Sequence, residues 1–286
     1  MKASSFNYVK PRSIDQVWGL LKEHGSDAQI LAGGQSLMAM LNLRMATPKI
    51  LIDITALPDL RDITVTKDCL RIGALVTHSQ VLASIEISKY VPLLSQAVPH
   101  VAHLAIRNSG TIGGSFALAD PAAEYPAVAL ALQATIVLSG PDGERRVLAE
   151  DFFKGIYHTD KRPDELLVSV EFPKAQIGEY FVFDELTRRR GDYALCGLAA
   201  FVDVKGGVVN AARFAYLSMS DTPVLAQQAG TSLLGSSLTV DSINMACAQL
   251  VLELDPNPDL YGSVSSKKLW SSALLKRALI TIKGSL

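Results

Sequence analysis

The stretch ILAGGQSLMAM, residues 30–40, places two adjacent glycines between two apolar runs, with Gln35 and Ser36 directly behind them. Glycine costs backbone entropy on folding and brings no side chain to a core. Gly33 and Gly34 can adopt positive φ and lack Cβ atoms, so successive N–H groups can converge on an anion. Ser36 can add a hydroxyl donor. The pattern therefore predicts a backbone anion site that a polyphosphate can approach closely.

A second glycine stretch, SGTIGGS at residues 109–115, repeats this composition about 80 residues later and again ends in a small hydroxyl residue. Two such loops predict one ligand with two phosphates. Neither loop has the spacing G-x-G-x-x-G, and G-x-x-x-x-G-K-[ST] does not occur in the chain, which argues against a Rossmann or P-loop site. A Gly-Gly pair between apolar segments is also common in plain tight turns. From the residues alone, both interpretations stay open.

Length and composition limit the class of protein. The chain has 286 residues, 49% hydrophobic and 19% charged, which suits a sizeable core divided into two or three domains. Lys and Arg total 27 against 28 Asp and Glu, so no charge excess points to nucleic acid or to an anionic membrane surface. No window reaches the roughly 18 apolar residues of a spanning helix, and no secretory signal is visible. We expect a soluble, cytoplasmic protein.

The cysteines and histidines predict no metal site. Cys69, Cys196 and Cys247 are isolated and form no C-x-x-C pair, so neither a disulfide framework nor an iron–sulfur or zinc site is expected. His100 and His103 are spaced i, i+3 without a carboxylate or thiol beside them in the sequence. We interpret them as helix surface or as lining of a cofactor pocket. Redox chemistry in this chain would therefore depend on an organic cofactor.

Helices and strands alternate up to about residue 175. Ser13 and Gln16 form a capping box that starts a helix, and Gly25 ends that helix. The other elements expected here are strands within DAQILAGG (27–34), KILIDI (49–54) and DELLVSVEFP (164–173), hairpins at Lys67-Asp68 and at 141–143, and helices from Thr77, over 92–105 and from Pro121. This order predicts an α+β domain that contains both glycine stretches.

Beyond residue 177 the pattern changes to long strands followed by helices. Gly206-Gly207 suits a two-residue hairpin turn. The strands are expected within 178–189, 194–204 and 208–219, and the helices within 223–235, 239–254 and 266–282. A sheet covered on one face by helices is the predicted C-terminal domain.

Two stretches carry a family resemblance. AGGQSLMAMLNLRMATPKILIDI (32–54) and IRNSGTIGGSFALADPAAEYPAVALAL (106–132) resemble the flavin-binding stretches of the medium subunit of molybdenum hydroxylases, the family of carbon monoxide dehydrogenase and xanthine dehydrogenase. In that family the first carries A-G-G-[HQN]-S and the second R-N-x-G-T-I-G-G-[DNS]. The likeness covers nearly the whole chain and includes ELTRRRGDYALCGLAAFV (185–202) and LLKRAL (274–279).

The resemblance implies an α+β fold. An FAD-binding domain of the vanillyl-alcohol-oxidase type would span residues 1–176, with two subdomains, about 1–57 and 58–176, that grip FAD between them. A smaller α+β C-terminal domain, a sheet with helices on one face, would span residues 177–286.

The resemblance also implies which residues bind the cofactor. The first loop would cradle the diphosphate and the adjoining ribityl chain, and the second would close the other side. These residues are Ala32, Gly33, Gly34, Gln35, Ser36 and Leu37 in the first loop and Thr111, Ile112, Gly113, Gly114 and Ser115 in the second.

Three further residues have two interpretations each. Glu124 matches an acid that contacts a ribose hydroxyl, Leu167 matches a residue that packs on the isoalloxazine, and Tyr193 matches an aromatic near the ring. The alternative for Glu124 is an acid on a helix surface, that for Leu167 is a core residue, and that for Tyr193 is a partly buried residue of a strand. Asp120 is expected to cap the helix that begins at Pro121. Some relatives carry Lys near the ring where this chain has Glu185, which leaves the flavin potential open.

No acid, base or nucleophile stands beside the glycine loops in the sequence, so no catalytic residue is assigned. The resemblance implies that partner chains complete the enzyme: a large subunit with molybdopterin cytosine dinucleotide, and a small subunit with two [2Fe–2S] clusters, in a dimer of heterotrimers. This chain would pass electrons from the clusters through FAD to an external acceptor. A self-contained FAD oxidoreductase and an interaction subunit without cofactor are the alternatives.

Overall fold

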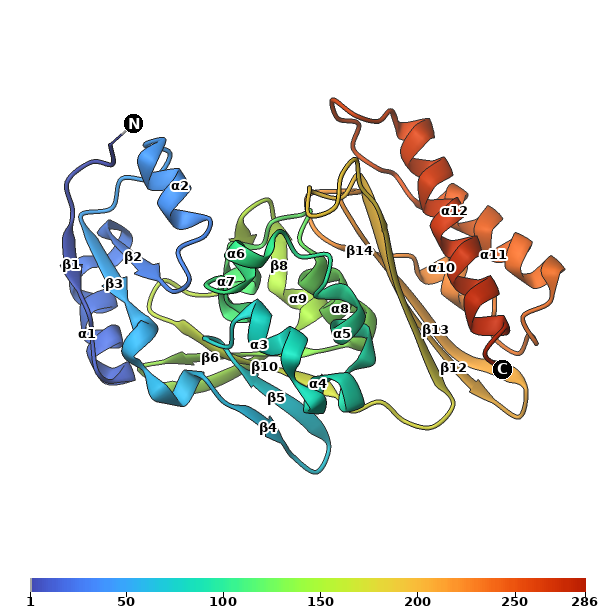
Figure 1. Ribbon diagram of the computed structural model, residues 1–286, viewed down its shortest axis with the longest axis horizontal. Coiled ribbons are helices and arrows are strands. Elements are labelled where there is room, and N and C mark those ends of the chain that lie inside the picture. Colours follow the sequence, from blue (N-terminus) through green and yellow to red (C-terminus); the bar gives the residue numbers. More distant parts are fainter. Residues whose placement is uncertain (1) are drawn as a thin grey trace.

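The computed structural model describes residues 2–286, and its three larger sheets with their helices follow one another along its long axis (Figure 1). The first sheet is parallel, in the order β1-β3-β2, with helices α1 and α2 beside it. Ser13 accepts the N–H of Gln16 and starts α1, while Gly25, at φ 52°, ends it as predicted. The bounds are β1 (Asn7–Val9), α1 (Ile14–His24), β2 (Ala28–Leu31), α2 (Leu37–Asn42) and β3 (Ile50–Asp53), with short 3-10 turns at Gly25–Asp27, Ile54–Ala56 and Pro58–Leu60.

The second sheet is antiparallel, in the order β4-β5-β10-β6-β7. Both predicted hairpins are confirmed, since β4 pairs with β5 and β6 with β7. One face packs on helices, and the other contributes Val137 and Val168 to a cluster with α1 and β3. The bounds are β4 (Ile63–Val65), β5 (Cys69–Gly73), α3 (His78–Ala83), α4 (Ile85–Tyr90), α5 (Pro92–Ala97), α6 (Leu104–Arg107), α7 (Ile112–Leu118), α8 (Glu124–Leu132), β6 (Thr135–Gly140), β7 (Gly143–Leu148), α9 (Ala149–Phe152), β8 (Phe153–Gly155), β9 (His158–Thr159) and β10 (Leu166–Pro173).

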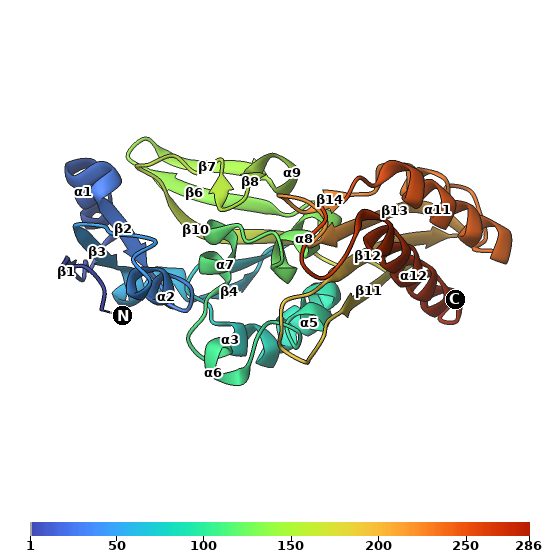
Figure 2. The same cartoon turned by 90° about the horizontal axis from the view of Figure 1, so that it is seen from above.

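The third sheet is antiparallel, in the order β11-β12-β13-β14. Its own helices α10 and α12 contact one face, with α11 packed against both, and α5 and α8 from the preceding part of the chain contact the other, so helices lie on both faces (Figure 1). Gly206 and Gly207 form the predicted turn with φ values of 59° and 81°. Figure 2 shows the same order from α1 at one end to α11 and α12 at the other. The bounds are β11 (Glu179–Leu186), β12 (Cys196–Lys205), β13 (Val208–Leu217), β14 (Val224–Leu225), α10 (Gln227–Thr231), α11 (Val240–Glu253) and α12 (Val264–Lys283).

Three helix predictions are wrong in their extent, and one of them is the helix expected over 223–235, where β14 precedes an α10 that covers only Gln227–Thr231. The helix expected over 92–105 ends at Ala97, because Pro99 cannot continue it, and α6 is a separate turn. His100 therefore lies in a loop. The helix expected from Pro121 begins only at Glu124, since the Asp120 carboxylate accepts the N–H of Ala122 at 2.9 Å and forms a turn there.

Three further observations concern disulfide bonds, metal sites and membrane-spanning helices. Cys69, Cys196 and Cys247 are free thiols. Among residues 2–286, no three His, Cys, Asp or Glu side chains cluster in a way that could hold a metal ion. No helix in the same part of the chain has the length and apolar character needed to cross a membrane.

Candidate functional site

Two glycine loops touch each other in the folded chain: the first glycine loop, residues 32–37, and the second glycine loop, residues 109–115. A Cβ atom on Gly33 would lie 2.1 Å from the carbonyl oxygen of Ser109 and 2.8 Å from Cα of Gly110. No side chain fits at that distance, so the contact joins backbone to backbone and requires glycine. The turn after β2 and the turn before α7 therefore form a single site (Figure 1).

The first glycine loop holds a row of backbone donors without acceptors. The N–H groups of residues 33–37 donate to no group within residues 2–286, and α2 begins with the N–H of Met38 bonded to the carbonyl oxygen of Gly34 at 3.0 Å. Gly34 turns the chain with φ of 70°, the one positive φ among the glycines of both loops. The hydroxyl of Ser36 makes no cap bond to α2. Five successive N–H groups of this kind fit a diphosphate, whose oxygens only accept hydrogen bonds.

The second glycine loop uses its N–H groups inside the chain. Ile112 donates to the carbonyl oxygen of Val76 and Gly113 to that of Ala74, both at 2.9 Å. The N–H groups of residues 114 and 115 donate to the hydroxyl and carbonyl oxygens of Thr111, each at 3.1 Å. A Cβ on Gly113 would lie 2.5 Å from Cβ of Ala74. The glycines of this loop therefore serve close packing, and the two loops are not equivalent donors.

A buried polar pair supports the second glycine loop from behind. His78 Nδ1 lies 3.2 Å from the Tyr125 hydroxyl, and a Cβ on Gly110 would come within 2.8 Å of the His78 ring. Burial, and secondarily the charge of Arg107, lowers the pKa of His78 to about 4. A neutral imidazole therefore packs under the loop at neutral pH. Arg107 donates to the carbonyl oxygens of Val101 and Ala102, each at 2.8 Å, and holds the neighbouring loop in place.

Glu124 lies at the first position of α8, next to the loops. Burial, together with the nearby carboxylate of Glu185, raises the pKa of Glu124 to about 8. The side chain is therefore mostly protonated at neutral pH. A protonated carboxyl can donate a hydrogen bond as well as accept one.

Leu167 and Tyr193 lie in contrasting environments. Leu167 is 3% exposed and belongs to the main core between the second and third sheets. Tyr193 is 68% exposed and lies in the loop between β11 and β12 rather than in a strand. Although most of the residue is exposed, partial desolvation of its side chain and the nearby carboxylate of Asp120 raise the pKa of Tyr193. Tyr157, which adopts φ 55° at the tip of the β8–β9 hairpin, is close to the same carboxylate.

An ion pair that the sequence did not suggest lies beside this region. His100 Nδ1 is 3.0 Å from Glu185 Oε1, and the Glu185 side chain is only 4% exposed. This hydrogen bond raises the pKa of His100. Both residues line a cavity of about 320 Å³ together with Pro99, Thr187, Arg190 and Gly191. The cavity lies where the loop before α6 meets the loop after β11.

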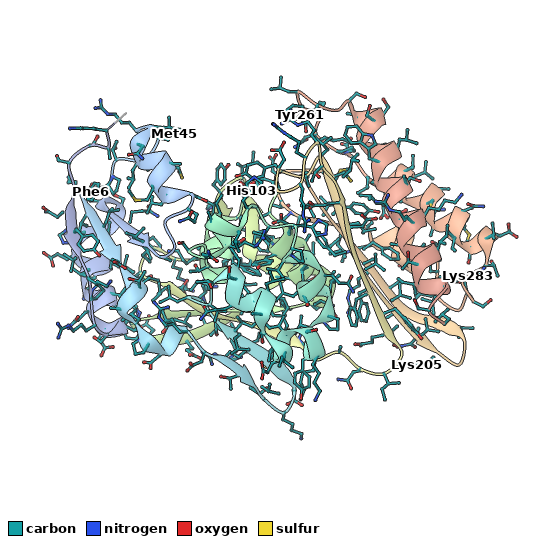
Figure 3. The ribbon with its side chains drawn as sticks, viewed as in Figure 1. Phe6, Met45, His103, Lys205, Tyr261 and Lys283 are labelled. Carbon is teal, nitrogen blue, oxygen red and sulfur yellow. The ribbon has the colours of Figure 1, made fainter. Side chains whose placement is uncertain are left out.

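The two walls of that cavity are in contact. A Cβ on Gly191, at φ 80°, would lie 2.5 Å from the ring of His103. His103 lies on the upper edge of the molecule, between Met45 of the N-terminal part and Tyr261 of the C-terminal part (Figure 3). The pairing of His100 with Glu185 joins residues 85 positions apart, so no local pattern could predict it. Pro99 was the one available signal that His100 leaves the helix.

Comparison with known proteins covers the whole chain. The sequence model described as "FAD binding domain in molybdopterin dehydrogenase" matches residues 4–175, and that described as "CO dehydrogenase flavoprotein C-terminal domain" matches residues 181–282. The 6-hydroxypseudooxynicotine dehydrogenase complex subunit alpha of Paenarthrobacter nicotinovorans is 39% identical over 98% of this chain and 95% of its own length. The carbon monoxide dehydrogenase medium chain of Hydrogenophaga pseudoflava is 34% identical over 96% of both chains. The solved structure of quinoline 2-oxidoreductase from Pseudomonas putida 86 superimposes with a TM-score of 0.94 and 36% identity, over 100% of this chain and 99% of that chain.

Proposed function

The chain belongs to the FAD-binding medium subunits of molybdenum hydroxylases, and on that premise we propose that it passes electrons from the [2Fe–2S] clusters of a small subunit to an external acceptor. A large molybdopterin subunit hydroxylates the substrate in this proposal, and the complex is a dimer of heterotrimers in the cytoplasm. Membership in this family makes the chain an oxidoreductase subunit, in agreement with the resemblance found in its sequence.

The row of free N–H groups at residues 33–37 carries the proposal for this chain. Ala32 and these five residues would hold the FAD diphosphate and the adjoining ribityl chain. The second glycine loop would close the other side, chiefly by keeping the first loop in position through the Gly33–Ser109 contact. Glu124, Leu167 and Tyr193 complete the proposed FAD-binding set.

FAD, when bound, supplies the electron exchange, and the chain contributes binding, orientation and electrostatics. The hydrogen bonds of Ile112 and Gly113 to the segment before α3 hold the second glycine loop rigid. A rigid second loop keeps the N–H groups of residues 33–37 in one orientation, so the first glycine loop loses little conformational entropy when FAD binds. The exposed ring of Tyr193 can exclude water from a bound flavin. We assign no catalytic acid or base to this chain.

Visible spectroscopy tests the proposal on the purified complex and on the separate full-length chain. We expect both to show flavin absorption, with one FAD released per chain on denaturation. An organic substrate of the complex should bleach the flavin only when the partner subunits are present. Bleaching of the separate chain by the substrate would indicate a self-contained oxidoreductase. A colourless chain that takes up no added FAD would indicate an interaction subunit and contradict the proposal.

A further inference from the structure

The cavity beside His100 has an unusual mixture of polar groups. Glu185 Oε2 is fully buried and has no hydrogen-bond partner within the described residues, although its other oxygen is paired with His100. An unpartnered buried carboxylate oxygen is costly, which points to a ligand that supplies a donor. Arg190 adds a cation to the same cavity. The site therefore offers one strong acceptor next to the cationic donor Arg190.

The strand that carries Glu185 and the helix that precedes the His100 loop are fixed to each other. Gln96 of α5 accepts the N–H of Phe183 at 2.9 Å and donates to the carbonyl oxygen of Phe181 at 3.1 Å. These bonds cover the free edge of β11 and set the loop that carries His100 against Glu185. The His100 ring also packs on Phe183, with ring centroids 5.2 Å apart. The acceptor is thus held in one position before any ligand arrives.

The charges around the cavity exclude simple ions as its ligand. A cation would meet Arg190, and an anion would meet the carboxylate of Glu185. A neutral group with one N–H between two carbonyl oxygens can pair with both charged groups of the cavity. Its N–H donates to the carboxylate, and one of its carbonyl oxygens accepts from a cationic donor. A volume of about 320 Å³ lies within the range of about 300–1,000 Å³ for small-molecule sites.

We propose that this cavity receives the imide edge of the flavin ring, with the carboxylate of Glu185 accepting the ring N–H and His100 holding that carboxylate in place. The inference rests on the proposed function. It specifies which end of the cofactor the chain recognises, and which residues recognise it. Glu185 is the specificity-determining acceptor, and His100 is a positioning residue. Flavins that lack the imide N–H should bind poorly.

N3-methyl-FAD tests this assignment, because the methyl group removes the donor and leaves the rest of the cofactor intact. We expect the deflavinated full-length chain to bind N3-methyl-FAD roughly 30-fold more weakly than FAD, as measured by quenching of flavin fluorescence. In Glu185→Ala the acceptor is gone and space is opened, so the two cofactors should bind within about threefold of each other. Equal binding of both cofactors by the unmodified chain would overturn the inference.

Two variants control for effects on folding. Asp184→Asn changes the adjacent carboxylate, which points to the opposite face of β11 and pairs with Arg277, so it should keep the full discrimination. Glu185→Gln keeps an uncharged acceptor and should discriminate less than the unmodified chain and more than Glu185→Ala. Discrimination unchanged in both Glu185 variants would also overturn the inference. A chain that binds neither cofactor would instead contradict the proposed FAD function itself.

Discussion

The two glycine loops look alike in sequence and differ in what their backbones do. In the first, the N–H groups of residues 33–37 have no acceptor within residues 2–286, and in the second, those of residues 112–115 all donate inside the chain. The first loop is partly exposed, whereas Gly110 to Gly113 are buried. The same small residues thus meet two requirements: free donors in one loop, and close packing in the other.

This difference changes how the glycines should be understood. Gly33 has no positive φ, and its missing Cβ makes room for Ser109 of the other loop. Gly113 makes room for Ala74. Only Gly34 supplies the left-handed turn that a glycine-rich anion loop is expected to contain. Substitutions in the two loops should therefore separate loss of stability from loss of cofactor.

Gly113→Ala should have the largest effect, and the effect should be on stability. Its Cβ would lie 2.5 Å from Cβ of Ala74 and 2.7 Å from the carbonyl oxygen of the same residue, in a buried position. Overpacking of this kind should lower the free energy of unfolding by about 3 kcal/mol, measured by urea denaturation. Gly19→Ala, in open space on α1, is the control and should stabilise by up to about 1 kcal/mol. Equal stability of the two variants would contradict the packing role.

Gly33→Ala should act mainly on the cofactor. The added Cβ would force the first glycine loop away from Ser109, and the N–H groups of residues 33–37 would no longer point at the diphosphate. Loss of about two hydrogen bonds to the diphosphate corresponds to roughly 100-fold weaker FAD binding, measured by equilibrium titration. Circular dichroism should stay near that of the unmodified chain, since this contact lies outside the three core clusters. Undiminished FAD affinity would show that the loop contact does not position the donors.

The two hydroxyl residues that precede α2 and α7 sharpen the comparison. Thr111 accepts the N–H of Gly114 and caps α7, so Thr111→Ala should lower the free energy of unfolding by about 1 kcal/mol. Ser36 makes no cap bond, so Ser36→Ala should change it by less than about 0.5 kcal/mol. For FAD affinity the two variants should rank in the opposite order: Ser36→Ala should weaken binding about tenfold, and Thr111→Ala should weaken it less. The same order in both measurements would make the loops equivalent after all.

The last prediction concerns pH rather than the glycine loops. The pKa of Glu124 is raised from 4.5 to about 8, mainly by burial, so the folded chain holds a proton that the unfolded chain releases. The contribution of Glu124 to stability should therefore fall as pH rises from 4.5 to about 8. Glu124→Gln should remove this decline, measured as the difference in unfolding free energy between the variant and the unmodified chain across that range.

Exposed Glu150 offers the matched control for this titration, because Glu150→Gln should leave the decline intact. His78 acts in the opposite direction: its pKa is lowered to about 4, so stability is lost as pH falls from 6.5 to about 4. That loss is common to all three proteins and cancels in the difference. A difference that does not vary with pH would contradict a partly buried, protonated Glu124.

Local sequence signals were enough for most of the elements. The cap at Ser13, the stop at Gly25 and the Gly206-Gly207 turn depend on neighbouring residues only, and all three occur as predicted. The predicted helix over 92–105 failed because its apolar spacing was given more weight than Pro99. The short pair β8 and β9 had no signal, since two or three residues are too few for a period.

The site divides in the same way. The motifs around Gly33 and Gly113 carried the resemblance to a family of FAD-binding subunits, and the match of the whole region to the FAD-binding domain model confirms that family. Only the tertiary structure decided that His100 pairs with Glu185. It also decided that residue 33 must be glycine, because a Cβ there would clash with Ser109. Whether an N–H group is free or bonded depends on what packs beside it, and packing joins residues that the sequence keeps far apart.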